Sequence, residues 1–303
     1  CLYALIMAGS TAISQLLLWT KTVKYVDFQK VQLAQIKKHF LPIIRLFVPM
    51  IALSIYHFMD KTMLDLLSTE AEVGYYYAAD KIIYIPLGLI TAIGTVMLPR
   101  ISSIVGESKE KTEKLLSKST ELSICMSCAV GFGIAAIARV FVPLFFGEGY
   151  EKCVNLLVLF VPVLFVKSLS NVVDQQYLIP AKCDNQYTLA VTGGAIVNLI
   201  CNGLLIPQLG SVGATLGTLM AELSVLIVSA HCAKKEIRFF RMFSRYSYYL
   251  LLGLIMFIAV RFFDSYSHIE RSFIRLILMI MIGGGVYSLL CLTVWLKVKE
   301  KSV

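Results

Sequence analysis

Long apolar stretches, separated by short polar connections, form the dominant pattern along the chain. Each stretch has 17 to 24 residues, close to the roughly 20 that an α-helix needs to cross a bilayer core. Lipid offers no hydrogen-bond partners, so such segments are stable there as helices, which satisfy their own backbone groups. The pattern predicts an all-α polytopic membrane helix bundle with nine transmembrane helices. They are expected at residues 2–19, 41–59, 82–98, 119–142, 153–173, 188–206, 212–230, 246–263 and 273–296.

Basic residues are unevenly divided between alternating connections. Nineteen lysines and arginines lie on one side of the predicted membrane and three on the other. Because cytoplasmic connections carry an excess of Lys and Arg, the richer side is expected to be cytoplasmic, including the C-terminus. The basic connections are 20–40, 99–118, 174–187, 231–245 and the tail, and the poor ones are 60–77, 143–152, 207–211 and 264–272.

The composition excludes an ordinary soluble domain. The mean hydropathy is +0.77, with 58% hydrophobic and only 16% charged residues. The net charge of +9 comes from connections beside the apolar stretches, which favours anionic lipid headgroups over nucleic acid as partners. The eight cysteines show no zinc-site spacing, and no phosphate-binding Gly-rich loop is present, so no metal or other cofactor is expected.

A carboxylate in the middle of an apolar stretch needs a physical account. Glu222 lies about ten residues into the stretch 212–230, roughly 15 Å from either end at 1.5 Å per residue. An ionised carboxylate there costs about 3 kcal/mol or more, so Glu222 is expected to be protonated, paired or facing a wet cavity. Two interpretations stay open: proton or substrate coupling, and a buried structural hydrogen bond.

Other polar residues inside the predicted spans are candidates for a transport pathway. Asn198 and Asn202, four residues apart, share one helix face and would bind sugar hydroxyls or a neighbouring helix. Arg45 and Lys167 lie near the cytoplasmic ends of their spans. Each would either reach the interface by snorkelling or contribute a cation to a cavity. In the second case, Lys167 would form a phosphate site.

A second group of charges lies around the hairpin 60–77. Asp60, Lys61, Asp80 and Lys81 are expected at the outer mouth of this hairpin, either as a mutual ion-pair set or as part of a site. The tyrosines 75–77 are expected at the headgroup level, where amphipathic rings are favoured.

Catalysis finds little support in the sequence. The four histidines are dispersed, and no Ser-His-Asp or metal-ligand spacing occurs. Polar groups spread through the membrane without a catalytic cluster indicate a pathway, so a transporter is predicted rather than an enzyme.

Four motifs resemble one known family. They are MDKTMLDLLSTEAEVGYYYAADKI with the later MLPRIS, FFGEGY, VNLICNGLLIPQLG and GATLGTLMAE. In this order they are similar to the polysaccharide-export branch (Wzx-type O-antigen and capsule repeat-unit flippases) of the multidrug/oligosaccharidyl-lipid/polysaccharide exporter superfamily. The matching positions of the first motif include Asp60, Gly74, Pro99 and Arg100.

The resemblance implies a transporter of about fourteen helices in two lobes, of which this chain would be the C-terminal part. Residues 1–19 would be the last helix of the N-terminal lobe, 20–40 a basic cytoplasmic linker, 41–230 the six-helix C-terminal lobe and 231–303 two additional helices and a tail. The cargo would be an undecaprenyl-diphosphate-linked oligosaccharide, flipped by alternating access across a bacterial cytoplasmic membrane. A polysaccharide polymerase and chain-length machinery are the protein partners implied.

For such a cargo, the implied substrate-binding candidates are Arg45, Asp60, Lys81, Lys167, Asn198 and Asn202, with Glu222 as the proton-coupling candidate. Cations would bind the diphosphate, and amides and carboxylates the sugars. Three alternatives stay open. They are a peptidoglycan-precursor or drug exporter of the same superfamily, a membrane-embedded polymerase or acyltransferase, and a non-transporting scaffold.

Overall fold

The computed structural model describes residues 2–22, 58–234, 236–267 and 272–300, with isolated positions at 40, 43, 44, 47 and 269. Within these residues the backbone forms helices and turns, with no strand, which confirms the all-α prediction. The chain divides into two units, Cys1–Val48 and Pro49–Val303. In the first unit, α1 (Leu2–Thr22) contains the first predicted span. Most of the second predicted span, 41–59, and the linker 23–39 lie outside the described residues.

Seven helices of the second unit are long and apolar enough to cross a membrane, and they coincide with seven predicted spans. They belong to a multi-pass membrane protein. The segment 58–67 is also helical and precedes them. The elements are α3 (Glu70–Ser102), α4 (Lys109–Phe146), α5 (Lys152–Val173), the π-helical turn η1 (Asp174–Leu178), α6 (Asp184–Leu209), α7 (Ser211–Ala233), the short α8 (Phe239–Tyr246), α9 (Tyr248–Tyr266) and α10 (Ser272–Glu300).

Several connections are much shorter than predicted. Residues 60–77 were expected to form an outer connection, but the helix break there is confined to Ser68 and Thr69. The Thr69 side chain accepts a hydrogen bond from the Glu72 backbone N–H and caps α3, which therefore begins in polar sequence. Ser108 caps α4 in the same way through the Lys111 N–H. Apolar length alone could not reveal these extensions.

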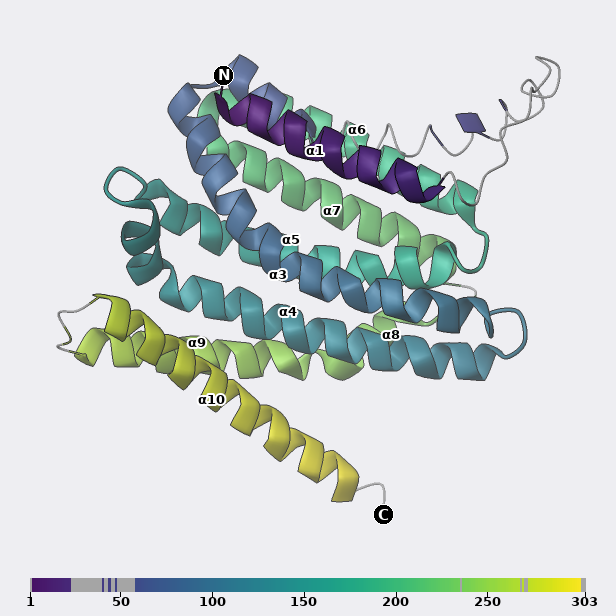
Figure 1. The fold of residues 1–303 in the computed structure, drawn as a ribbon. Coiled ribbons are helices and arrows are strands. Elements are labelled where there is room, and N and C mark those ends of the chain that lie inside the picture. Colours follow the sequence, from purple (N-terminus) through teal and green to yellow (C-terminus); the bar gives the residue numbers. More distant parts are fainter. Residues whose placement is uncertain are drawn as a thin grey trace. The chain divides into compact units, whose positions relative to one another are not determined.

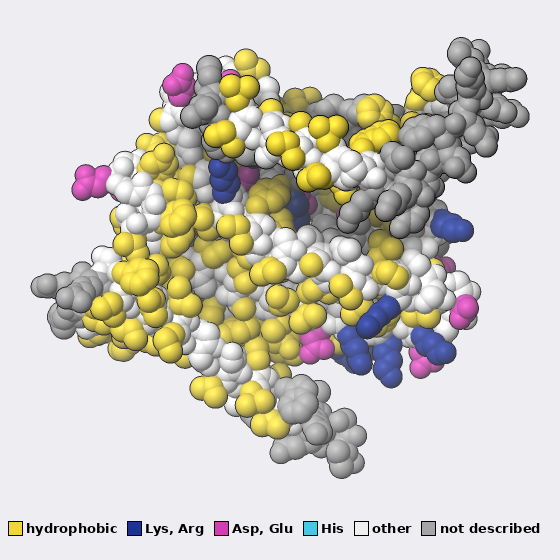
Figure 2. All heavy atoms as spheres, in the orientation of Figure 1, with side chains coloured by type: hydrophobic (Ala, Val, Ile, Leu, Met, Phe, Trp, Pro, Cys, Tyr) yellow, Lys and Arg dark blue, Asp and Glu magenta, His cyan; other side chains and the backbone are white. Residues whose placement is uncertain are grey.

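The central element of the second unit is α5, which packs against α3, α4 and α7. Figure 1 shows α3, α4, α5 and α7 running side by side along their length. The α6 and α7 helices form a tight antiparallel pair, while α9 packs on α4 and α10 packs on both of them. Large apolar side chains remain exposed on the outer faces of these helices, and yellow atoms predominate on the face seen in Figure 2. Such exposure is expected of helices that face lipid acyl chains.

Glycine makes the close contact between α6 and α7 possible. A Cβ atom built on Gly213 would lie 2.4 Å from the Leu205 carbonyl oxygen, and one on Gly217 would lie 2.0 Å from Asn202 Oδ1. Ala221, the next member of this series, is fully buried. This series of small residues therefore allows the two helices to approach closely. It matters for the site because Gly217 leaves the space that the Asn202 amide occupies.

The α9–α10 hairpin is held by one buried carboxylate. Asp264 accepts hydrogen bonds from Arg261 at 2.8 Å and pairs with Arg275 at 2.6 Å, while Arg275 also donates to the Asp264 carbonyl oxygen. This arrangement joins the end of α9 to the first turn of α10.

Substitution of Gly213 tests the α6–α7 contact. Gly213→Ala should destabilise the protein by about 1–3 kcal/mol, because its Cβ meets backbone rather than a movable side chain. Gly193→Ala on α6 is the control, since a Cβ there meets open space. Thermal unfolding of the purified protein in detergent should show a lower midpoint for the first variant alone. Equal midpoints would contradict the close approach.

Candidate functional site

A buried carboxylate lies where the segment 58–67 meets α3, α6 and α7. We refer to Asp60, Tyr76, Asn198, Asn202 and Thr218 as the Asp60 cluster. All five side chains are buried, and both asparagines have no exposed surface. On α6, regular spacing places the two asparagines on one buried face. The residues that recur there every fourth position are Ala190, Gly194, Asn198, Asn202 and Ile206.

Four side chains surround the Asp60 carboxylate. Asn198 and Asn202 each donate an amide N–H to Oδ1, at 2.8 and 2.6 Å. The Tyr76 hydroxyl donates to Oδ2 at 2.9 Å, and the Thr218 hydroxyl lies 2.8 Å from the same oxygen. No ion pair joins Asp60 to any residue in the described parts of the chain. Neutral donors from three helices therefore stabilise this buried charge.

The Asp60 cluster has the chemistry to hold a proton or a small hard cation. An ionised carboxylate only accepts hydrogen bonds, so protonation of Asp60 would force one of its donors to rearrange. The Asn202 Oδ1 atom is buried and has no hydrogen-bond partner among the described residues. Hard cations bind amide and carboxylate oxygens as ligands. No group of three His, Cys, Asp or Glu side chains suited to a metal occurs in the described ranges.

Beside this cluster, Lys61 and Asp80 form an ion pair at 2.9 Å. The Lys61 ammonium also lies 4.4 Å from the centre of the Tyr77 ring. The predicted ion-pair set is thus confirmed for Lys61 and Asp80 but is wrong for Asp60, which binds amides and hydroxyls instead. Lys81 is exposed and forms no ion pair within the described residues. The headgroup level expected for the tyrosines stays a prediction, and the Tyr76 side chain, which is 2% exposed, faces the interior of the bundle.

A second ion pair joins α5 and α7. Lys167 and Glu222 lie 2.9 Å apart, with side chains 20% and 6% exposed. Glu222 is therefore paired, one of the states expected for a carboxylate at this depth, and Lys167 does not need to snorkel. The Lys167 ammonium also lies 5.6 Å from the centre of the Tyr84 ring on α3.

This ion pair lines a partly open cavity of about 240 Å³ between α3, α5, η1, α6 and α7, which we call the Lys167 cavity. Lys167 also lines a smaller cavity of about 30 Å³ that includes Asp60, Asp80 and Thr218, so the two cavities share one cation. The lining of the larger cavity is Thr91, Lys167, Ser170, Asn171, Asp174, Gln175, Tyr187, Val191, Glu222 and Val225.

The π-helical turn η1 shapes one wall of the Lys167 cavity. It widens the helix at Asp174–Leu178 and places Asp174 and Gln175 on the lining. Asp174 Oδ1 and Ser170 Oγ are buried without a partner among the described residues. Single π-turns inside helices occur frequently at functional sites. The π-turn therefore adds polar side chains to the wall of the cavity.

The structure brings together five of the seven candidates predicted from sequence. Asp60, Asn198 and Asn202 meet in the Asp60 cluster, and Lys167 and Glu222 meet in the Lys167 cavity, while Lys81 stays apart. Arg45 lies outside the described residues. Sequence reasoning missed Tyr76, Thr218, Asn171 and Asp174 as site residues. Buried-face spacing was the available signal for Tyr76, which lies four residues before Asp80 on α3.

Comparisons match this chain to proteins that are named flippases or transporters. A family model described as "Lipid II flippase MurJ" matches residues 4–282. A "Putative O-antigen transporter" of Escherichia coli (strain K12) is 26% identical over 176 residues, covering 58% of this chain and 42% of that protein. A "Probable low-salt glycan biosynthesis flippase Agl15" of Haloferax volcanii is 22% identical over 241 residues, covering 78% and 50% of the two chains.

Solved structures show the same fold. "Lipid II flippase MurJ, inward closed conformation" superposes with a TM-score of 0.75 at 17% identity, over 94% of this chain and 61% of the other. An outward-facing multidrug resistance MATE family transporter of the MOP superfamily gives a TM-score of 0.52 at 20% identity, over 81% and 63%. The chain spans about half the length of the curated relatives that it matches. The superfamily predicted from the four motifs is confirmed.

The Lys167–Glu222 pair can be tested as a buried ion pair. Lys167→Met should destabilise the protein by about 3–5 kcal/mol, because Glu222 would lose the cation with which it forms a largely buried ion pair. Adding Glu222→Gln should recover part of this loss. Thermal unfolding in detergent of the two single variants and the double variant measures the coupling. Strictly additive losses would show that the two side chains do not depend on each other.

Proposed function

Because the chain belongs to the lipid II flippase MurJ family, we propose that it forms part of a flippase for a polyprenyl-diphosphate-linked oligosaccharide. The names of its curated relatives, an O-antigen transporter and a glycan biosynthesis flippase, support a saccharide cargo. Family membership also favours transport over the polymerase and acyltransferase alternatives. In bacteria, the cargo would be an undecaprenyl-diphosphate-linked repeat unit of a surface polysaccharide.

The Lys167 cavity is the observation that carries this proposal. Its lining places one cation, two carboxylates and several amide and hydroxyl groups inside a bundle whose outer faces are apolar. A diphosphate requires cations, and sugar hydroxyls require amides and carboxylates. Intramembrane charges that face an interior cavity mark substrate pathways. Asn171, Asp174 and Gln175 are the proposed sugar contacts, in addition to Glu222.

We propose that Lys167 changes partner during transport. Its ammonium is neutralised by Glu222 at 2.9 Å in this conformation. A diphosphate entering the cavity would compete with Glu222 for Lys167, so cargo binding would weaken the link between α5 and α7. The cargo would therefore bind one conformation more tightly than the other, as alternating access requires. Arg45 and Lys81 stay candidates for further phosphate contacts.

The complete transporter is proposed to have about fourteen helices in two lobes, divided as the sequence predicts at 1–19, 20–40, 41–230 and 231–303. It would lie in the bacterial cytoplasmic membrane with a cytoplasmic C-terminus. The charge asymmetry of the connections supports this orientation. A polysaccharide polymerase and its chain-length machinery are the proposed protein partners.

A second candidate cargo is a peptidoglycan precursor. The description of the matching family model, a lipid II flippase, supports it. Deleting the gene and determining the mass of the lipid-linked saccharides that accumulate on the cytoplasmic side distinguishes the two cargoes. Accumulation of neither, with unpolymerised repeat units outside, would rule out the flippase and favour the polymerase.

We further propose that the Asp60 cluster couples transport to a proton or a cation. Its carboxylate is held by side chains from three helices, so a change in its charge would alter the packing of all of them. Glu222 is paired with Lys167 in this arrangement, so Asp60 is a better candidate for coupling than Glu222.

Charge at Lys167 is the first functional test. Lys167→Ala, introduced into the chromosomal gene, should abolish export of the surface polysaccharide while the protein still inserts in the membrane. Lys167→Arg keeps the cation and should retain measurable export. Immunoblotting of membranes and quantification of the polysaccharide are the measurements. Normal export from Lys167→Ala would remove this residue from the cargo site.

Asp60→Asn tests the coupling site. The variant keeps the size of the side chain but removes its charge, so export should fall at least tenfold while the protein remains in the membrane. Asp65→Asn is the matched control, because Asp65 is exposed on the same helical segment. Export is measured as above. If both variants export equally well, the Asp60 carboxylate plays no part in coupling.

A further inference from the structure

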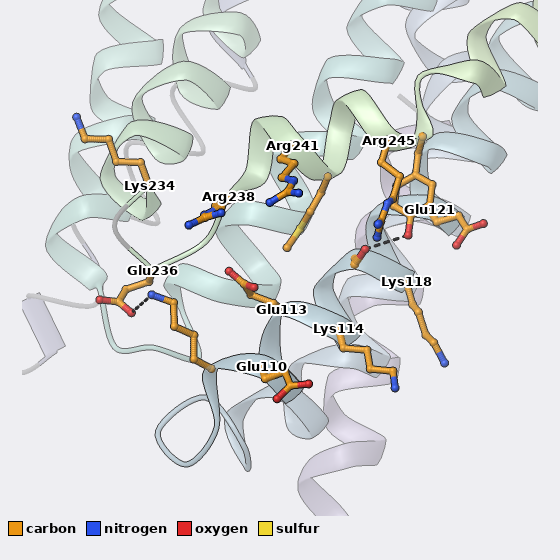
Figure 3. A pocket seen from close by; sticks show the side chains of 14 residues that line it. Glu110, Glu113, Lys114, Lys118, Glu121, Lys234, Glu236, Arg238, Arg241 and Arg245 are labelled. Atoms are coloured by element: carbon orange, nitrogen blue, oxygen red, sulfur yellow. Dashed lines mark hydrogen bonds and ion pairs between the residues drawn. The ribbon is translucent and has the colours of Figure 1, made fainter. Parts of the chain in front are cut away.

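A basic pocket lies at the predicted cytoplasmic end of the second unit, away from the Lys167 cavity. Its volume is about 850 Å³, and its walls are the first turns of α4 on one side and Lys234 with residues 236–246, which include α8, on the other. Figure 3 shows the arginines extending from α8 towards the wall formed by α4. The lining residues are Lys109, Glu110, Glu113, Lys114, Ser117, Lys118, Glu121, Lys234, Glu236, Arg238, Arg241, Met242, Arg245 and Tyr246.

The basic pocket contains more positive than negative side chains. Seven lysines and arginines line it, against four glutamates. One ion pair, between Lys109 and Glu236 at 3.2 Å, is formed across it. The other six cations form no ion pair with the described part of the chain. Like charges gathered in a concave site raise the local potential, and a bound anion relieves their repulsion.

The short helix α8 is built to present these arginines. Phe239 and Met242 are buried against the core, while Arg238, Arg241 and Arg245 follow a separate face at helical spacing. Phe240 is 62% exposed on a third face. A short helix with buried, cationic and exposed aromatic faces is typical of a position in the membrane interface.

The position of α8 along the chain identifies the source of the anion. It connects α7 to α9 and forms the first, polar part of the candidate span Phe239–Tyr266, which places α8 at the membrane boundary, at the level of the lipid headgroups. At this level on the cytoplasmic side, the abundant anions are lipid phosphates, and basic pockets between helices bind them. Three glutamates on α4 disfavour an extended polyanion, because it would pass close to them.

We propose that the basic pocket binds the phosphate headgroup of an anionic lipid from the cytoplasmic leaflet. The headgroup bridges α4 to α8 and so fixes the α9–α10 hairpin against the rest of the bundle. The Ser117 and Tyr246 hydroxyls already join the two walls at 2.9 Å. The lipid adds a second, charge-based link between them. This site is separate from the cargo site and does not depend on the proposed transport function.

Native mass spectrometry of the complete gene product in detergent, titrated with cardiolipin or phosphatidylcholine, tests the proposal. Cardiolipin, with two phosphates, should bind in preference to phosphatidylcholine. Arg241→Gln/Arg245→Gln should weaken cardiolipin binding at least tenfold, since each basic residue near a lipid surface contributes about 1 kcal/mol. Glu113→Gln removes a repulsive charge from the pocket and should strengthen binding, which misfolding could not do.

Arg100→Gln/Lys111→Gln provides the matched control. It removes two exposed charges from the same end of the bundle without touching the pocket, so cardiolipin binding should persist. Equal weakening in both double variants would overturn the proposal, as would equal binding of phosphatidylcholine. Soluble pyrophosphate that binds as tightly as cardiolipin would assign the pocket to free phosphate instead. Retention of an acidic peptide with no cardiolipin preference would assign it to a protein partner.

Discussion

The need to satisfy charge inside an apolar bundle organises this protein. Asp60 accepts hydrogen bonds from α3, α6 and α7, and each of those helices is apolar on its lipid-facing side. Leaving such a carboxylate unpaired in hydrocarbon would cost several kcal/mol. The helices therefore have to pack so that Tyr76, Asn198, Asn202 and Thr218 converge on one point. Gly217 makes this convergence possible by leaving room for the Asn202 amide.

The two buried ion pairs extend the same logic. Lys61 with Asp80 and Lys167 with Glu222 neutralise four charges that the membrane could not tolerate singly. Ion pairs of this kind contribute little net stability when compared with apolar packing. In the exchange proposed above, a cargo phosphate would replace Glu222 as the partner of Lys167. Lys167 would then serve packing in one conformation and cargo binding in another.

Two polar regions of the unit are proposed to bind anions of different origin. The Lys167 cavity, with its π-turn and polar lining residues, lies among the central helices and suits the cargo. The basic pocket lies at one end, between α4 and α8, and suits a lipid phosphate. Figure 2 shows basic side chains gathered at that end of the bundle. The anion of the cargo and the anion of the bilayer would thus be bound at different places.

Sequence alone determined seven of the membrane spans, because apolar length depends only on local composition. The superfamily followed from the four motifs instead, and the apolar stretches placed Glu222, Asn198 and Asn202 inside spans. The predicted starts of α3 and α4, at 82 and 119, were ten or more residues too late, because the caps Thr69 and Ser108 start these helices in polar sequence. The partners of each polar group were decided only by tertiary structure. Asp60 lies 138 residues from Asn198, and Lys167 lies on a different helix from Glu222, so only the packing of distant helices could bring them within hydrogen-bonding distance.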